Sequence, residues 1–238
     1  MTSNEILLEL KDVKSSYGKV NVLRDLSFRL YQGESLAILG RNGVGKTSTL
    51  KTIMGLLKCQ SGTIQFEGKL INTISPYQIP RMGVGYVPQG RGLFPNLTVK
   101  ENLYLGYKKE CSPDLSDYIF ERFPRLKERL NQQAGTLSGG EQQMLSIARI
   151  LLIHPKIILL DEPTEGIMPI LVSEIREEIK RINGAGIGIL LVEQNVQTAI
   201  RLCSRILVMD KGSIIFETKT DDVRSNPEIL HEHLGMHV

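Results

Sequence analysis

Residues 40–47 read Gly40-Arg41-Asn42-Gly43-Val44-Gly45-Lys46-Thr47. An apolar run at residues 35–39 precedes them, and we expect a helix from Lys46 to about residue 57. A glycine-rich turn between a buried strand and a helix fits the pattern G-x-x-x-x-G-K-[ST], whose backbone N–H groups surround phosphate oxygens. An ordinary glycine-rich turn that happens to contain Lys-Thr is the alternative, and the flanking strand and helix disfavour it. The stretch therefore predicts a nucleotide-phosphate site, with Lys46 reaching the β- and γ-phosphates and Thr47 binding Mg²⁺.

Two carboxylates follow a second buried strand. Residues 157–160 are all Ile or Leu, and Asp161 and Glu162 come directly after them. Open α/β sheets bind ligands at the carboxyl ends of their strands. Asp161 suits Mg²⁺ coordination, and Glu162 suits the activation of an attacking water. Taken alone, the two carboxylates could simply end a strand at the surface, but a full phosphate loop in the same chain favours the chemical role.

A second glycine-rich segment reads Leu137-Ser138-Gly139-Gly140-Glu141-Gln142-Gln143. Ser138 and Glu141 have the spacing of a capping box, in which each side chain satisfies a backbone N–H at the start of a helix. Gly139 and Gly140 carry no side chain there, so we expect bare N–H groups and the positive end of the helix dipole to face an anion. The segment predicts a second phosphate-seeking helix start, far along the chain from the first.

The remaining pattern predicts one α/β domain over residues 1–238, with a helical subdomain inserted at about residues 90–150. Strands are expected at residues 6–14, 22–30 and 62–67, so the opening third is strand-rich. Thr98 and Glu101 predict another capped helix start, and Pro124 is expected in the first turn of a further helix. A strand at 187–192 and a helix at about 171–182 complete an α/β crossover.

Composition excludes several classes of protein. Lys and Arg exceed Asp and Glu by only three, which gives no indication of nucleic-acid binding. No apolar run approaches the ~20 residues of a membrane-spanning helix, and the first residues show no secretory signal. Three scattered cysteines favour a reducing compartment. His231, His233 and His237 could bind zinc, but a solvated tail is favoured because no Cys or acidic residues accompany them.

The phosphate loop, the acidic pair and the segment at 137–143, in this order, make the chain resemble an ATP-binding-cassette (ABC) transporter ATPase over nearly its whole length. The resemblance implies a P-loop NTPase (RecA-like) α/β core, an N-terminal antiparallel β subdomain and an α-helical subdomain. The α-helical subdomain carries residues 137–143, which we call the signature segment. ATP and Mg²⁺ are the implied cofactors. The residues implied to contact ATP are Tyr17, Gly40, Arg41, Asn42, Gly43, Val44, Gly45, Lys46, Thr47, Ser48 and Gln89.

The same resemblance assigns roles to individual residues. Thr47, Gln89 and Asp161 are the implied metal contacts; Glu162, Lys46 and Gln194 are the implied catalytic residues. Tyr17 matches the aromatic residue that stacks on adenine, although alone it would be a half-buried strand residue. Gln89 would otherwise be an ordinary loop amide. Ser138, Gly139, Gly140 and Glu141 are implied to contact ATP held by a second ABC ATPase subunit in a head-to-tail dimer.

Several short phrases, such as Val87-Pro88-Gln89-Gly90-Arg91 and Leu191-Val192-Glu193-Gln194-Asn195, resemble one branch of the family. That branch contains the smaller ATP-binding subunits of importers for branched-chain and hydrophobic amino acids, and of urea or short-chain amide importers. The implied partners are two transmembrane permease subunits and, indirectly, a substrate-binding protein, at the cytoplasmic face of the inner membrane. A lipid-export cassette and a non-transport cassette (iron–sulfur assembly or repair) are the alternatives.

Two residues depart from the family pattern. Gln194 stands where most cassettes have His, and a neutral amide cannot carry the charge of an imidazolium. Met168 replaces the usual Asp of the loop after Glu162, so it cannot make a polar contact across the dimer. These departures favour pairing with a different cassette that supplies the usual His.

Overall fold

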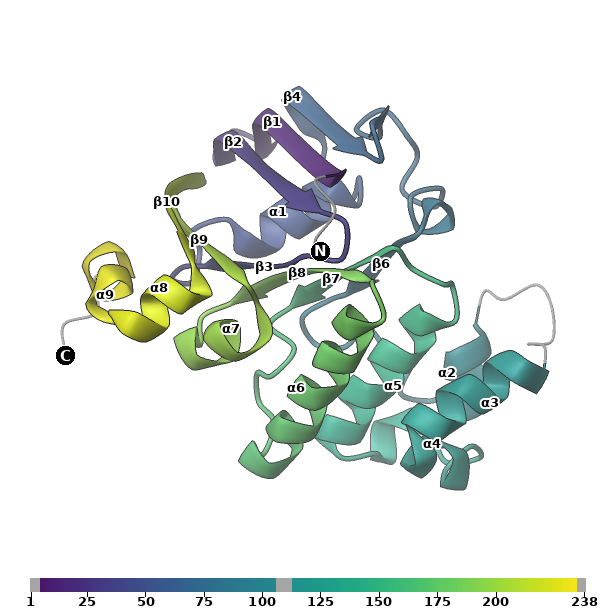
Figure 1. The fold of residues 1–238 in the computed structure, drawn as a ribbon. Coiled ribbons are helices and arrows are strands. Elements are labelled where there is room, and N and C mark those ends of the chain that lie inside the picture. Colours follow the sequence, from purple (N-terminus) through teal and green to yellow (C-terminus); the bar gives the residue numbers. More distant parts are fainter. Residues whose placement is uncertain (1–4, 106–112, 235–238) are drawn as a thin grey trace.

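The computed structural model describes residues 5–105 and 113–234, which form two β-sheets with helices around them (Figure 1). The strands are β1 (Ile6–Tyr17), β2 (Val20–Tyr31), β3 (Ser35–Leu39), β4 (Cys59–Phe66), β5 (Lys69–Leu70), β6 (Val84–Val87), β7 (Ile157–Asp161), β8 (Gly188–Glu193), β9 (Arg205–Asp210) and β10 (Ser213–Lys219). The helices are α1 (Lys46–Ile53), α2 (Val99–Tyr104), α3 (Pro113–Arg122), α4 (Pro124–Glu128), α5 (Gly139–Leu151), α6 (Pro169–Gly184), α7 (Val196–Leu202), α8 (Thr220–Ser225) and α9 (Glu228–Leu234), with 3₁₀ turns at Pro80–Met82 and Ala134–Thr136.

The smaller sheet is antiparallel, with the strand order β2-β1-β4-β5. It confirms the strand-rich opening third, although its strands are longer than predicted: β1 and β2 have 12 residues each, and β4 begins at Cys59. A tight turn joins β1 to β2, and Gly18 adopts a φ of 57° there, which a residue with a side chain rarely takes.

The larger sheet has the order β10-β9-β3-β8-β7-β6. Its strands from β9 to β6 are parallel, and β10 is antiparallel to β9. All five residues of β3 and of β7 are buried, which confirms the interpretation of these apolar runs as central parallel strands. The carboxyl ends of β3, β7 and β8 therefore lie together at one edge of this sheet, as the sequence predicted.

Two hydrophobic cores lie on the two faces of this larger sheet. Leu36 and Ile38 of β3 belong to the core shared with α1 and the antiparallel sheet, whereas Ala37 and Leu39 face the core shared with α5 and α6. Figure 1 shows α1 between the two sheets, and α5 and α6 on the opposite face. Because successive side chains of β3 point to opposite faces of the sheet, this one strand contributes to both hydrophobic cores.

The helical part of the chain starts at α2 and ends with α5. Thr98 caps α2 and Ser138 caps α5, each with a complete capping box, and Pro124 occupies the first turn of α4; all three features confirm the sequence prediction. Residues 89–98 form turns rather than a helix. The predicted helix to residue 57 was too long, because Gly55 adopts a φ of 69° just after α1 and ends it.

Helix α6 extends slightly beyond the predicted 171–182 at both ends and has 16 residues. Within the two described ranges, none of the helices combines the length and the apolar character needed to cross a membrane.

Candidate functional site

The phosphate loop connects β3 to α1. Gly43 and Gly45 have φ values of 81° and 117°, which glycine adopts without strain. Gly40 is needed for a different reason, because a Cβ atom there would lie 2.6 Å from the carbonyl oxygen of Met209. Asn42 and Gly43 are exposed at the tip of the loop. The loop therefore presents its backbone to solvent while its two ends pack tightly.

Lys46 folds back onto its own loop. Its Nζ donates to the carbonyl oxygens of Gly40 and Arg41 at 2.9 and 3.1 Å, and lies 3.3 Å from Oε1 of Glu162. The side chain is 5% exposed, so its charge is held by these oxygens and little by water. Phosphate oxygens are equivalent acceptors for an ammonium, so the residues fit a phosphate that would replace them.

Thr47 and Asp161 meet at the edge of the sheet. The Thr47 hydroxyl donates to Oδ1 of Asp161 at 2.9 Å, and the Tyr86 hydroxyl contacts Oδ2 at 3.2 Å. Burial raises the pKa of Asp161 above its ordinary value, and burial together with the nearby Asp161 raises the pKa of Tyr86. A partly buried hydroxyl and a buried carboxylate side by side are hard oxygen ligands, and this donor set fits Mg²⁺.

Glu162 lies at the centre of the site. It is buried, and its backbone has a φ of 47°, which is uncommon for a residue with a side chain. Gln194 donates from Nε2 to Oε1 of Glu162 at 2.9 Å, and Gln89 contacts Oε2 at 3.4 Å. The structure thus brings Lys46, Gln89 and Gln194, from three separate parts of the chain, around the Glu162 carboxylate.

The side chain of Gln89 does not lie on the Thr47–Asp161 pair, where the resemblance placed a metal contact. Its Nε2 donates to Oε2 of Glu165 at 2.8 Å, while its backbone N–H bonds to the Asp161 carboxylate. In this structure, therefore, Gln89 reaches the predicted metal site through its backbone, because the two glutamates hold its amide.

Sequence reasoning did not single out Glu193, the last residue of β8. Its carboxylate is 4% exposed, accepts from the Thr164 hydroxyl at 2.8 Å, and has its pKa raised by burial. Backbone N–H groups of Gln194 and Asn195 also donate to it, at 3.3 and 3.4 Å. It holds the turn that carries Gln194. A signal existed, since a carboxylate directly after an apolar strand is the same pattern that identified Asp161.

The signature segment is built as predicted at Ser138 and Glu141. The Ser138 hydroxyl and its N–H lie 2.7 and 2.9 Å from Oε2 of Glu141, and Arg129 lies 3.2 Å from the other carboxylate oxygen. Gly140 is buried, and a Cβ there would lie 2.5 Å from Cδ1 of Leu171. Its contact with the ATP of a second cassette stays a prediction. Gly140 allows α5 to pack closely against α6, whereas Ser138 is the exposed residue.

The loop after Gln89 is hydrogen-bonded to helix α5, the helix that begins in the signature segment. Arg91 donates to Oε1 of Gln142 at 2.8 Å and accepts, at its carbonyl, from the Ser146 hydroxyl at 2.6 Å. Arg149 donates to the carbonyl of Gly92 at 2.8 Å. The segments around Glu162 and around Ser138 are therefore connected through one short loop.

The remaining predicted residues differ in exposure and in contacts. Tyr17 is 49% exposed at the end of β1, and Met168 is 60% exposed just before α6. Arg41 donates to the carbonyl of Leu234, and the carbonyl of Ser48 accepts from Thr52 within α1. Val44 packs beside the core under the loop.

Of the three C-terminal histidines, the structure describes the side chain of His233 alone. His233 stacks on Phe216 with ring centroids 4.0 Å apart. The side chain of His231, and the whole of His237, lie outside the described residues. In the part of the chain that the structure describes, no three His, Cys, Asp or Glu side chains are grouped to hold a metal ion.

Comparisons with known proteins agree with this geometry. Residues 23–165 match the family model described as ABC transporter. Over 232 residues, covering 96% of this chain and 100% of the relative, the chain is 39% identical to the high-affinity branched-chain amino acid transport ATP-binding protein BraG of Pseudomonas aeruginosa. It is 33% identical to the lipopolysaccharide export system ATP-binding protein LptB of Haemophilus influenzae, over 96% of this chain and 97% of that one. A dimeric ATP-binding cassette in a post-hydrolysis state with ADP and Pi superposes with a TM-score of 0.80, at 26% identity, over 90% of this chain and 98% of that chain.

Proposed function

Because the chain belongs to the ABC transporter family of ATPases, which couple ATP hydrolysis to transport, we propose that it energises the uptake of branched-chain or hydrophobic amino acids through separate membrane subunits. The cluster of Lys46, Thr47, Asp161 and Glu162 at one sheet edge carries the hydrolytic part of the proposal. The likeness to a branched-chain amino acid transport protein supports the substrate class.

Lys46 and the loop backbone bind the phosphates of ATP in this proposal. The ammonium exchanges Glu162 and two loop carbonyls for phosphate oxygens, which frees the Glu162 carboxylate. The exposed ring of Tyr17 is the surface on which adenine stacks. Before nucleotide binds, the Lys46 ammonium is paired with the Glu162 carboxylate. Nucleotide binding therefore also releases Glu162 for catalysis.

Thr47 and Asp161 hold Mg²⁺, which supplies charge neutralisation to the phosphate oxygens when it is bound. The Tyr86 hydroxyl and the Gln89 backbone N–H fix the orientation of the Asp161 carboxylate. Burial disfavours an isolated negative charge on Asp161, and a cation bound beside it would stabilise the ionised carboxylate.

Glu162 orients and polarises the attacking water as the general base. Gln194 donates to the same carboxylate and so fixes its position, and it is suitably placed to donate to a phosphate oxygen instead. Glu193 positions Gln194 by holding the backbone N–H groups of the turn.

Cassettes of this family work as dimers, and we place Ser138 and Gly139 against the ATP of a second cassette. Exposed Ser138 is accessible for this contact, and Arg91 lies beside Gly139. The neutral Gln194 and the apolar Met168 favour a partner that is a different cassette. Equal specific ATPase activity for the chain alone and for the chain with its partner would count against this pairing.

Lipid export is the second candidate, since LptB is also a relative over nearly the whole chain. The experiment is to purify the chain with its native membrane subunits, reconstitute them in vesicles, and measure ATPase activity with substrate-loaded binding protein. Stimulation by leucine-loaded binding protein supports amino-acid import. Stimulation by urea or a short amide moves the assignment to that importer class, and co-purification with lipid-export subunits would refute import.

A further inference from the structure

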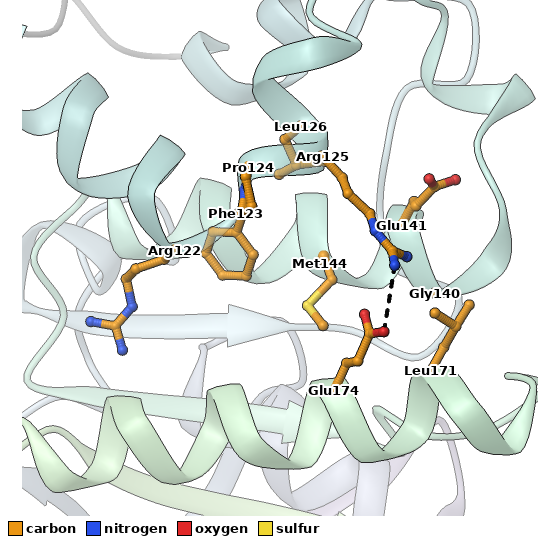
Figure 2. A pocket seen from close by; sticks show the side chains of 10 residues that line it. All are labelled: Arg122, Phe123, Pro124, Arg125, Leu126, Gly140, Glu141, Met144, Leu171 and Glu174. Carbon is orange, nitrogen blue, oxygen red and sulfur yellow. Dashed lines mark ion pairs between the residues drawn. The ribbon is translucent and has the colours of Figure 1, made fainter.

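A small cavity lies between the α3–α4 junction and helices α5 and α6, away from the phosphate loop (Figure 2). Its volume is about 130 Å³. The lining residues are Arg122, Phe123, Pro124, Arg125, Leu126, Gly140, Glu141, Met144, Leu171 and Glu174. None of the residues assigned to ATP hydrolysis lines this space, although Gly140 and Glu141 of the signature segment do.

The inner part of the cavity is apolar. Phe123 and Leu126 are buried on one side, and Met144 and Leu171 close the other. Apolar cavities of about 150 Å³ hold a molecule of the size of benzene, so this one accommodates a branched aliphatic side chain. Gly140 contributes to this shape because it brings α5 against Leu171.

Arg125 and Glu174 stand on opposite walls at the mouth of the cavity, and the Glu141 carboxylate, also in the lining, interacts with Arg125 as well. Arg125 of α4 and Glu174 of α6 lie 3.6 Å apart, and their side chains are 57% and 44% exposed. Figure 2 shows this pair across the opening. The neighbouring pair of Arg122 and Glu178 is different, because it is 2.6 Å long and largely buried. The outer pair is therefore loosely held and is free to accept other partners.

We propose that this cavity binds a free α-amino acid with a branched aliphatic side chain. The side chain enters the apolar space, the α-carboxylate pairs with Arg125, and the α-ammonium pairs with Glu174. A second hollow of about 340 Å³ shares Glu174 but is lined by both signs of charge, and Glu177 and Glu178 are paired with Lys180 and Arg122, so Glu174 is the carboxylate offered to the ammonium. The choice of amino acid rests on the proposed import function; the charge pattern comes from the site itself.

The cavity adjoins the signature segment. Glu141 forms part of the cavity wall and is also the capping partner of Ser138. An amino acid bound to both Arg125 and Glu174 takes the place of their direct contact, which joins α4 to α6 next to the signature segment.

The test is direct binding to the purified full chain, measured by calorimetry, with L-leucine as the probe. We expect Arg125→Gln and Glu174→Gln each to weaken leucine binding by about tenfold, the usual effect of losing one charge-assisted contact. The matched control is Lys180→Gln, which removes a comparably exposed partner of Glu177 on the same helix and should leave binding unchanged. Methyl NMR of the unsubstituted protein gives a second measurement, in which leucine should shift the Met144 methyl signal.

Three outcomes would overturn the inference. They are no leucine binding at millimolar concentration, leucine binding by Arg125→Gln and Glu174→Gln as tight as by the unsubstituted protein, and no shift of the Met144 signal. Equal binding of N-acetyl-leucine amide, which lacks both charges, would also overturn it, because the cavity would then be a groove for a protein side chain. Leucine binding without leucine import would refute the proposed function alone, and leucine import without binding here would refute this inference alone.

Discussion

Replacing Gly140 by alanine tests how the signature helix packs. A Cβ at this position would lie 2.5 Å from Cδ1 and 2.8 Å from Cβ of Leu171. Rotation of the leucine side chain relieves the first contact, but the second involves an atom attached to the backbone of α6. The two helices must therefore move apart by several tenths of an ångström.

The expected size follows from two opposing effects. Overpacking of a close contact destabilises by about 1–3 kcal/mol. Alanine stabilises a helix relative to glycine by about 0.5–1 kcal/mol. We therefore expect Gly140→Ala to lower the free energy of unfolding by about 1–2 kcal/mol, or the melting temperature by roughly 2–8 °C in a chain of this size. Gly184→Ala, near the end of α6, has no atom within 4 Å of its Cβ and should be neutral or slightly stabilising.

The assay is urea unfolding followed by far-UV circular dichroism, since the chain has no tryptophan. Leu171→Ala alone should destabilise by about 2 kcal/mol, the low end for a buried leucine. In the double variant the Cδ1 contact disappears and the Cβ contact remains, so its loss of stability should be smaller than the sum by about 0.5–1 kcal/mol. Strict additivity, or a Gly140→Ala protein as stable as Gly184→Ala, would refute the packing argument.

Four further substitutions test the catalytic site. Glu162→Gln should keep ATP binding in a nucleotide titration and lower kcat about 10²–10⁴-fold in a phosphate-release assay; wild-type turnover would show that another group activates water. Lys46→Ala should lose ATP binding in the same titration, because the buried ammonium is the charge aimed at the phosphates, and retained affinity would contradict this role. Because the pKa of Asp161 is raised in the folded protein, its ionised form reduces stability. The wild type should thus lose stability relative to Asp161→Asn as the pH rises above about 4 through that raised pKa, and melting curves whose difference is independent of pH would contradict the argument. Gln194→Ala removes one hydrogen bond to Glu162 and should lower kcat about tenfold without changing nucleotide affinity; unchanged turnover would leave Gln194 without a catalytic role.

The features that the sequence predicted well are local. The capping boxes of Thr98 and Ser138, and Pro124 in the first turn of α4, each depend on residues within four positions of one another. The phosphate loop depends on its own glycines and on the strand and helix beside it. The N-terminal strands were found but were too short at their ends, because pairing between strands extends them beyond the apolar alternation.

Positions that depend on distant neighbours were predicted less well. Leu171, on a different helix, packs against Gly140, a contact that the sequence did not predict. Glu165 and Glu162 hold the amide of Gln89 through contacts that the sequence did not predict. Glu193 was missed because its role lies in the turn that it stabilises. No spacing within the chain reports which side chain another element brings into contact.

The sequence alone determined the family, the α/β core, and the residue types that handle phosphate, since these are written in short motifs with their own backbone geometry. The tertiary structure decided how these motifs are joined: Lys46 is paired with Glu162 before nucleotide arrives, and the loop after Gln89 is fastened to the signature helix. It also formed the cavity beneath Arg125 and Glu174, whose walls come from three separate stretches of the chain. These arrangements follow from packing between elements far apart in sequence, which no local pattern encodes.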